Sequence, residues 1–403
     1  MRKRMSSKMH NSQGGRKIKL IFMGKKVVMS GSEAIAEAVK LCKPKVLPMY
    51  PITPSTLVPE KLSEFVFNGE LDAEMIHVES EHSAASALFG AYATGVRAFT
   101  ASASNGIALM HEILPIISGS RFPAVMSVAN RTISGPINIW NDHSDAMSER
   151  DQGWIQFYCE SAQEAFDTII MSYKLAEKEN ISLPVMVCID GFALSHVYEP
   201  VQIEDQKEVD AFLPEYKPKD FLDTKKPKSF GPIAFPNSFF EFHEQEQIAM
   251  EEALKEIPKI HSEYAKIFKR KYGNGLIELI EMKDAKYALI ANGTSVGTAR
   301  VVVEELRKKG KKVGLIKLKT FRPFPKEQII TVCKNLKALG VIDRHVSLGS
   351  EGAITLDVKA ALKDEKCKVE GFISGLGGRD IDITRLKKAF EILEKGQKGV
   401  WLK

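Results

Sequence analysis

Apolar runs alternate with helical patterns along the first half of the chain. Strand-like runs occur at 45–49, 74–78, 98–102, 123–129 and 184–189. Helical patterns lie before and between them, at 32–39, 57–67, 82–94, 105–117 and 162–178, and Ser32 is the expected cap of the first. This alternation predicts an α/β unit in which helices cover both faces of a parallel sheet.

A second α/β unit is predicted toward the end of the chain. Residues 200–240 are rich in Pro, Lys and aromatic side chains without clear periodicity, so we expect an extended, wrapping segment. A helical pattern follows over 241–272 with an interruption at Pro258, since proline has no amide donor for a helix interior. Further strand-like runs lie at 287–291, 312–318, 338–343 and 369–374, with one helix ending near 308 and another capped near Thr384.

These patterns divide the chain into parts. We expect a disordered basic tail over 1–26, a first domain over 27–240, a helical connector over 241–283 and a second domain over 284–403. The formal charge is +6, and much of it lies in this tail, so the charge does not by itself indicate nucleic-acid binding.

Composition is that of an ordinary soluble globular protein, with 44% hydrophobic and 27% charged residues. No apolar run approaches the ~20 residues of a membrane span, and Leu20–Met23 is too short for the core of a signal peptide. The five cysteines are scattered without a Cys-x-x-Cys pair, which speaks against an iron–sulfur cluster, a structural zinc or disulfides in this chain. Cys159 and Cys188 lie in apolar runs and should be buried. We therefore expect a cytoplasmic protein that binds neither membranes nor nucleic acid.

Polar residues follow the strand-like runs of the first domain. Thr53, Glu81, Asn105, Arg131 and Asp190 each come directly after such a run. Because ligands of parallel sheets bind beyond the carboxyl ends of the strands, these residues are expected to gather at one edge.

Three short motifs stand out at this edge. In Tyr50-Pro51-Ile52-Thr53-Pro54-Ser55-Thr56 two prolines bracket a threonine, which also fits an ordinary rigid turn. The others are Val78-Glu79-Ser80-Glu81-His82-Ser83-Ala84-Ala85 and Asn130-Arg131. Together the motifs resemble the alpha subunit of the four-subunit archaeal-type pyruvate:ferredoxin oxidoreductases, and the resemblance spans residues 27–395. It implies a thiamine-diphosphate-binding fold of the pyrimidine type, followed by a domain similar to the transketolase C-terminal domain.

Glu81 is the expected catalytic residue. In the family the second glutamate of this motif contacts the aminopyrimidine of thiamine diphosphate, and Glu81 aligns with it while Glu79 does not. A carboxyl group at the ring nitrogen N1′ favours the imino tautomer that removes the thiazolium proton. The alternative is a carboxylate that only stabilises a helix N-terminus.

Thr53 and Arg131 form the expected substrate clamp, and Asn105 is expected at the cofactor. The planar fork of an arginine suits the carboxylate of a 2-oxoacid, and the family has an arginine at this point. The alternative for Arg131 is a surface ion pair. The loop Pro136–Asp145 resembles the family's loop near the substrate pocket, although His143 stands where an aromatic residue is common. His143 is expected to be a solvated loop histidine rather than an acid–base group.

The motif that binds the diphosphate through a metal is missing. Asp190-Gly191 lacks the glycine that precedes the aspartate in a Gly-Asp-Gly motif. The resemblance therefore implies that the beta subunit supplies the diphosphate half and Mg²⁺, while iron–sulfur clusters belong to partner subunits. Two further matches to the family, Gly375-Leu376-Gly377-Gly378-Arg379-Asp380 and Thr320–Pro325, are expected to have structural and subunit-contact roles.

The implied reaction is the reversible oxidative decarboxylation of pyruvate with coenzyme A to acetyl-CoA, carbon dioxide and reduced ferredoxin. The implied partners are the beta, gamma and delta subunits, with ferredoxin as electron acceptor. Tyr50–Thr56 taken with Asn138–Asp142 resembles the pyruvate members more than the branched-chain 2-oxoacid members. Branched-chain 2-oxoacids, 2-oxoglutarate and a non-catalytic organising subunit remain as alternatives.

Overall fold

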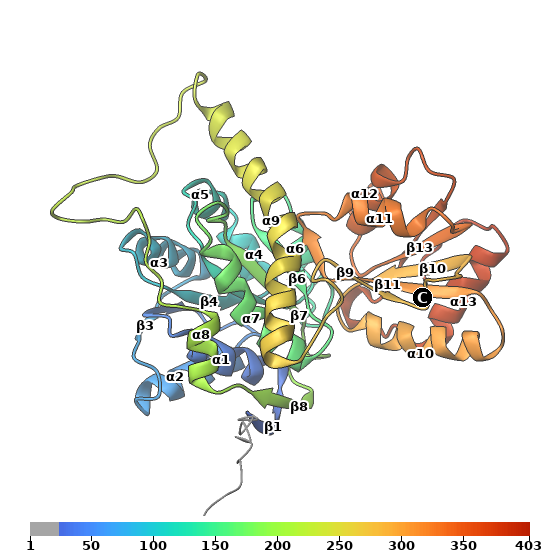
Figure 1. The fold of residues 1–403 in the computed structure, drawn as a ribbon, viewed down its shortest axis with the longest axis horizontal. Helices are drawn as coiled ribbons and strands as arrows, with labels where there is room; N and C mark the ends of the chain where they lie inside the picture. Colours follow the sequence, from blue (N-terminus) through green and yellow to red (C-terminus); the bar gives the residue numbers. More distant parts are fainter. Residues whose placement is uncertain (1–23) are drawn as a thin grey trace, which may run out of the picture.

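The computed structural model describes residues 24–403, and Figure 1 shows their arrangement as two α/β bodies beside one long helix. The expected basic tail lies outside the described residues up to position 23. Lys25 and Lys26 belong to a strand rather than to a tail, because β1 (Lys25–Ser30) pairs antiparallel with β8 (Tyr198–Ile203).

The first body contains a five-stranded sheet in the order β12-β6-β7-β5-β4. Its parallel strands are β4 (Phe99–Ser102), β5 (Val125–Asn130), β6 (Ile155–Tyr158) and β7 (Val185–Asp190). The parallel pair β2 (Val46–Met49) and β3 (Glu74–His77) joins its edge through a bridge from Val46 to Ala98. The predicted parallel sheet is confirmed, although β6 had no predicted counterpart.

Helices cover both faces of this sheet, as predicted. On one face, alternate strand residues such as Val125 and Val187 join a core with α1 (Gly31–Cys42), α2 (Leu57–Phe67) and α7 (Ala162–Ala176). On the other face, Met126 and Met186 pack with α3 (Glu81–Ala93), α4 (Ser104–Met110), α5 (Leu114–Gly119) and α6 (Ser144–Ser148). The period-two alternation of the strands therefore builds two separate cores.

The second body has its own five-stranded sheet, in the order β14-β13-β10-β11-β9. The strands are β9 (Ile277–Ile280), β10 (Tyr287–Ala291), β11 (Val313–Leu318), β13 (Ala338–Asp343) and β14 (Lys368–Ile373), all parallel except β9. Its helices are α10 (Ser295–Lys308), α11 (Lys326–Cys333), α12 (Ala353–Ala361) and α13 (Ile383–Glu394). Strand β12 (Thr320–Arg322) leaves this body and pairs antiparallel with β6 of the first.

Several local expectations were wrong. Helix α9 (Phe239–Phe268) runs through Pro258 without a break, because its buried face, including Ile257 and Ile260, packs on the first body and compensates for one missing amide donor. The helix expected over 105–117 is split into α4 and α5, and the wrapping segment contains β8 and α8 (Gln206–Phe212). Helix α1 is capped by Ser30, not Ser32, and α13 by Asp382, not Thr384.

Two further observations concern the described residues. All five cysteines are free and buried, including Cys159 and Cys188 as expected. No helix within 24–403 is long and apolar enough to cross a membrane.

A buried ion cluster joins the two bodies. Glu164 on α7 is fully buried and accepts hydrogen bonds of 2.8 Å from Lys317 Nζ and 2.8 Å from Lys319 Nζ. Both lysines, at the end of β11, are themselves 2% or less exposed. Burial alone would raise the pKa of Glu164, yet the charges of the two lysines lower it to about 2. Lys317 Nζ also donates to Glu160 Oε2 at 2.9 Å, so two lysines and two glutamates balance in charge where the bodies meet.

Replacing Glu164 with glutamine should destabilise the fold by about 3–5 kcal/mol at pH 7, because the buried ammonium group of Lys319 loses its counter-charge and that of Lys317 keeps only Glu160 and Glu278. The folded pKa lies below the unfolded value, so the difference from wild type should be full above pH 4.5 and shrink toward pH 2. Urea unfolding at several pH values measures both effects. Glu304→Gln, which breaks an exposed pair with Lys308, is the matched control and should change stability by less than about 1 kcal/mol.

Candidate active site

Glu81 is the first residue of α3, shortly after the end of β3, and is only 6% exposed. Ser80 caps the helix by accepting a 3.3 Å hydrogen bond from the amide of Ser83. Gly106 on α4 faces the carboxylate, and a β-carbon there would lie 2.5 Å from Glu81 Oε1. Within the described residues no donor reaches the Glu81 carboxylate, so a buried acceptor remains open for a ligand.

Glu79, the competing carboxylate, has a different environment. It is exposed, and its carboxylate already accepts a hydrogen bond from Ser83 Oγ. That hydrogen bond lowers the pKa of Glu79 below its ordinary value. A solvated, already paired carboxylate is a poorer partner for a pyrimidine than the enclosed Glu81.

The structure brings Thr53 and Arg131 together. Arg131 follows β5, and its Nη1 donates a 2.9 Å hydrogen bond to the carbonyl oxygen of Thr53. Its Nε donates to the carbonyl of Asn138 at 3.1 Å, which ties the guanidinium to the loop after β5. No hydrogen bond of Nη2 is found within residues 24–403. The guanidinium is held from two sides by backbone oxygens rather than by a carboxylate, so it is not an ion-pair residue.

Asp145 organises this region and was missed by the sequence analysis as a site residue. Its Oδ2 accepts 2.9 Å hydrogen bonds from the amides of Arg131 and Ser104, and its Oδ1 accepts from Asn130 Nδ2 at 2.8 Å. Burial raises the pKa of this fully buried carboxyl to about 6, against the lowering effect of its hydrogen bonds. Asp145 thereby joins the end of β5 to the start of α4.

Asn105 lies next to this junction. Its side chain is exposed, and its Oδ1 accepts a 3.0 Å hydrogen bond from the amide of Ser134. The preceding Ser104 has φ = 51°, a left-handed conformation that is uncommon outside glycine and turns the chain sharply into α4. The Asp145 carboxylate stabilises that turn by accepting the Ser104 amide.

His143 was expected to be a solvated loop histidine, but this expectation was wrong, because the side chain is fully buried. Its Nε2 lies 2.7 Å from Asp190 Oδ1, and Arg344 of the second body donates from Nη1 to Asp190 Oδ2 at 2.6 Å. The amide of Thr294 adds a 3.0 Å hydrogen bond. Burial alone would raise the pKa of Asp190, yet Arg344 and His143 hold it well below its ordinary value. Both carboxylate oxygens of Asp190 are therefore bound by protein groups, and the side chain is buried rather than exposed at the edge of the sheet.

The glycine turn after β14, residues 375–378, contacts the loop 136–145 of the first body. The amide of Gly378 donates to the Asn141 carbonyl at 2.6 Å, and Asn138 Nδ2 donates to the Gly377 carbonyl at 3.2 Å. A β-carbon at Gly378 would come within 2.3 Å of Trp140. These contacts lie within one chain, so the turn has a structural role here.

An α/β sheet whose carboxyl edge carries an enclosed glutamate at a helix N-terminus is an arrangement suited to a pyrimidine cofactor. Comparisons with known proteins agree with a domain that binds thiamine diphosphate. Residues 37–262 match the family model described as pyruvate flavodoxin/ferredoxin oxidoreductase, thiamine diP-bdg, and residues 285–386 match pyruvate:ferredoxin oxidoreductase core domain II. The chain therefore belongs to the pyruvate:ferredoxin/flavodoxin oxidoreductase family.

Similar proteins span nearly the whole chain. Pyruvate synthase subunit PorA of Methanocaldococcus jannaschii is 51% identical over 372 residues, which covers 92% of this chain and 95% of that protein. Pyruvate synthase subunit PorA of Pyrococcus horikoshii is 50% identical, with the same coverage of each chain. Ketoisovalerate oxidoreductase subunit VorA of the same organism is 42% identical, over 92% of this chain and 94% of that protein.

The fold is also similar to that of a solved 2-oxoglutarate:ferredoxin oxidoreductase from Magnetococcus marinus. The TM-score is 0.70 at 17% identity, and the match covers 93% of this chain and 66% of that chain. At that identity the likeness shows the fold alone.

The residues present fit the pyrimidine half of thiamine diphosphate. The Glu81 carboxylate is enclosed and lacks a donor in the described part of the chain, and Gly106 leaves room beside it that any larger residue would fill. Ser102 Oγ, 2.5 Å from the same β-carbon position, is buried without a hydrogen-bond partner. The Glu81 carboxylate is thus left without a donor, and the enclosed Ser102 Oγ is a second polar atom beside Gly106 without a hydrogen-bond partner in the described residues.

Asp145→Asn should destabilise the protein by about 2–3 kcal/mol at pH 7, since an amide nitrogen would face two buried N–H donors. The folded pKa of about 6 exceeds the ordinary 3.8, so the folded state holds the proton more tightly. The stability difference between wild type and variant should therefore fall as the pH rises from about 4 to about 6. Urea unfolding at each pH tests this, with Asp72→Asn, 97% exposed, as a control that stays near wild type.

Proposed function

We propose that this chain is the alpha subunit of a pyruvate:ferredoxin oxidoreductase and supplies the pyrimidine half of its active site. The complex catalyses reversible oxidative decarboxylation of pyruvate with coenzyme A, giving acetyl-CoA, carbon dioxide and reduced ferredoxin. The observation that carries the proposal is Glu81, enclosed at the start of α3 and without a donor in the described part of the chain. We propose the domain division at 27–240, 241–283 and 284–403; the two sheets and α9 support two α/β units and a connector, although β9 (Ile277–Ile280) of the second sheet lies within the connector range.

Pyruvate is favoured over the other 2-oxoacids. The pyruvate synthase relative from Pyrococcus horikoshii is 50% identical to this chain, against 42% for the ketoisovalerate enzyme of the same organism. A non-catalytic organising role is disfavoured, because such a subunit has no need for an enclosed carboxylate at Glu81 or for a guanidinium at Arg131 that is held by backbone oxygens.

Glu81 would hold a proton at N1′ of the pyrimidine. Thiamine diphosphate, when bound, supplies the nucleophilic carbon and the electron sink of the reaction. A carboxyl enclosed beside α4 has little contact with water, so a ring nitrogen would be its main hydrogen-bond partner. Gly106 permits this close approach, since any β-carbon there would occupy the space beside the carboxylate.

Arg131 and Thr53 would bind the carboxylate of the 2-oxoacid. Two nitrogens of Arg131 are already fixed to carbonyl oxygens, so the guanidinium plane is oriented before a substrate arrives. The Thr53 side chain is exposed at the same edge, next to Pro54, which Gly191 contacts closely. We place Asn105 at the cofactor. It follows Ser104, whose amide binds the same Asp145 oxygen as the amide of Arg131.

The other half of the site belongs to partner subunits. Asp190, the aspartate that most resembles a metal-binding motif, is committed to Arg344, His143 and Thr294. We therefore place the diphosphate and Mg²⁺ on the beta subunit and the iron–sulfur clusters on the gamma, delta or beta subunits. Free buried cysteines agree with a reducing cytoplasm.

Glu81→Gln should lower turnover by roughly 10²–10⁴, because an amide cannot exchange a proton with the pyrimidine. The assay is reduction of a viologen dye by the reconstituted complex with pyruvate and coenzyme A. Glu79→Gln is the matched control and should keep near-full activity. The opposite pattern, an active Glu81 variant and an inactive Glu79 variant, would assign the role to the other carboxylate. A wild-type complex inactive with pyruvate but active with another 2-oxoacid would reject the substrate.

Arg131→Ala should reduce kcat/KM for pyruvate by the equivalent of about 2–5 kcal/mol, since the substrate carboxylate loses its charged partner. The loss should appear mainly as a raised KM if ground and transition states are bound equally. Arg131→Lys should restore only part of it, because an ammonium lacks the planar fork. Thr53→Val should have a milder effect on the same step. Unchanged steady-state constants in Arg131→Ala would remove this residue from the site.

A further inference from the structure

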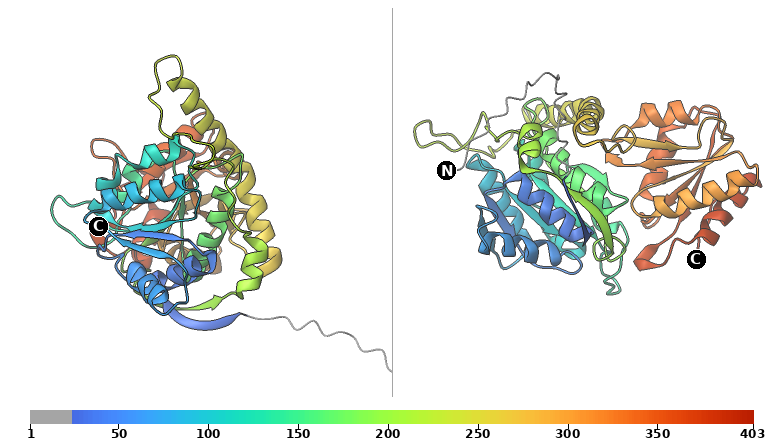
Figure 2. Two further views of the ribbon diagram at one scale, coloured as in Figure 1. Left: turned by 90° about the vertical axis from the view of Figure 1, so that its left-hand side faces the viewer. Right: turned by 60° about the horizontal axis from the view of Figure 1, so that its bottom comes forward.

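Helix α9 has one side that nothing in the described chain covers. It is 30 residues long, which corresponds to about 45 Å. Ala253, Ile257, Ile260 and Tyr264 on one side are buried against the first body. Figures 1 and 2 show the helix along the outside of that body, with its N-terminal end extending beyond it.

Charge is segregated along this helix. Residues 239–252 contain five glutamates, at 241, 244, 246, 251 and 252, and no lysine or arginine. Residues 253–268 contain lysines at 255, 259 and 266 against glutamates at 256 and 263, and Lys269 and Lys271 follow directly after the helix end. One end of the element is therefore acidic and the other basic.

Exposed apolar side chains gather at the acidic end, and we call them the aromatic knob. They are Ile233, Phe235, Phe239, Phe240 and Phe242, with exposures of 84%, 66%, 55%, 72% and 42%. So many large apolar groups within ten residues are unusual on the surface of a monomer and indicate an interaction site.

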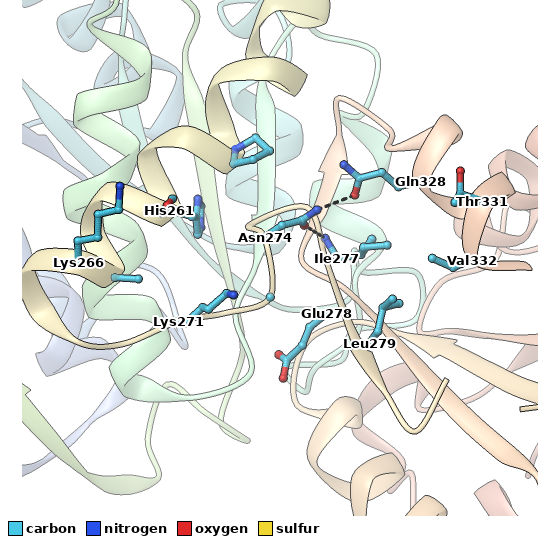
Figure 3. Close-up of a pocket in the computed structure, with 14 residues that line it drawn as sticks. His261, Lys266, Lys271, Asn274, Ile277, Glu278, Leu279, Gln328, Thr331 and Val332 are labelled. Atoms are coloured by element: carbon cyan, nitrogen blue, oxygen red, sulfur yellow. Dashed lines mark hydrogen bonds between the residues drawn. The ribbon is translucent and has the colours of Figure 1, made fainter. Parts of the chain in front are cut away.

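The basic end borders a cavity of about 790 Å³ between α9, β9 and α11 (Figure 3). Its lining includes apolar groups from Pro258, Ala265, Ile277, Leu279 and Val332. Lys266 and Lys271 also line it, and neither has a salt bridge within residues 24–403. The cavity offers apolar walls with positive charge, the complement of an acidic aromatic knob.

We propose that two copies of this chain pack their α9 helices antiparallel about a twofold axis, with the aromatic knob of each copy at the cavity of the other. A twofold axis at Ala253 places position 251 opposite position 255 and position 240 opposite position 266. Glu251 then meets Lys255 of the second copy, and Phe240 reaches Lys266 at the cavity mouth. The same contacts occur twice, as in any isologous interface.

A second copy fits better than an unrelated partner because this one surface contains both halves of the complementary pair. Glu251, Lys255 and Lys266 are exposed and lie on the uncovered side of α9, with Phe240 and Ile248. The helix alone offers about 500 Å² along one side, from its length and a diameter of ~10–12 Å. The knob and the cavity extend this toward the ~800 Å² per partner of a stable interface.

Charge exchange tests the pairing directly. Sedimentation velocity on the full chain should show a dimer at micromolar concentration that weakens with added salt. Glu251→Lys and Lys255→Glu alone should each weaken the dimer about tenfold or more, because each places like charges opposite one another twice. Mixing the two variants, or combining both changes in one chain, should restore association. Restoration in the mixture requires contact between two copies.

Phe240→Ser tests the knob and should also weaken the dimer, while Phe67→Ser, 91% exposed on α2, is the control that should not. Circular dichroism confirms that each variant is folded. The proposal is overturned if the wild-type chain is monomeric, if the single charge variants associate normally, or if the mixture fails to associate. A knob that instead binds another subunit would give the first of these results.

Discussion

The buried carboxylate of Asp190 is the constraint on which the arrangement of the two bodies depends. It ends β7 and accepts hydrogen bonds from Arg344 and Thr294 of the second body, with His143 of the loop 136–145 at 2.7 Å. A buried guanidinium without its counter-charge is strongly destabilising, so the three elements hold their positions together. Glu164 on α7 joins the two bodies in the same way, because it accepts hydrogen bonds from Lys317 and Lys319 of the second body. Two buried carboxylates thus lock the second body onto the first.

The open edge of the sheet owes its order to a third buried carboxylate, Asp145. It accepts the amides of Ser104 and Arg131, so α4 and the end of β5 are held in fixed register. Arg131 is then oriented by backbone oxygens at Thr53 and Asn138, and Gly106 on α4 lies directly against Glu81. Neither Glu81 nor Arg131 has an ion pair within residues 24–403, and Asp145 contacts the backbone amide of Arg131 rather than its guanidinium.

Alternating patterns predicted the parallel strands β4, β5, β7, β10, β11, β13 and β14 but not β6, β9 or β12. The residues after the predicted strands included Thr53, Glu81 and Arg131. Period-two and period-3.6 patterns depend only on neighbouring residues, so they can be recognised in a single sequence. Asp145, His143 and Lys319 could not be found this way, because their partners Arg131, Asp190 and Glu164 lie 14 to 155 residues away and a buried charge resembles a solvated one in sequence. The helix break expected at Pro258 was wrong because the tertiary packing of α9, which cannot be read from the local sequence, outweighs one lost hydrogen bond.

We propose that this chain holds the pyrimidine half of thiamine diphosphate and that a partner subunit holds the rest. A structure of the assembled complex with bound thiamine diphosphate would test this division of the site. We expect the Glu81 carboxylate within about 2.6–3.2 Å of N1′, with the diphosphate and its metal contacted by another subunit. Diphosphate oxygens or Mg²⁺ bound by residues of this chain, or N1′ paired with a carboxylate other than Glu81, would contradict it.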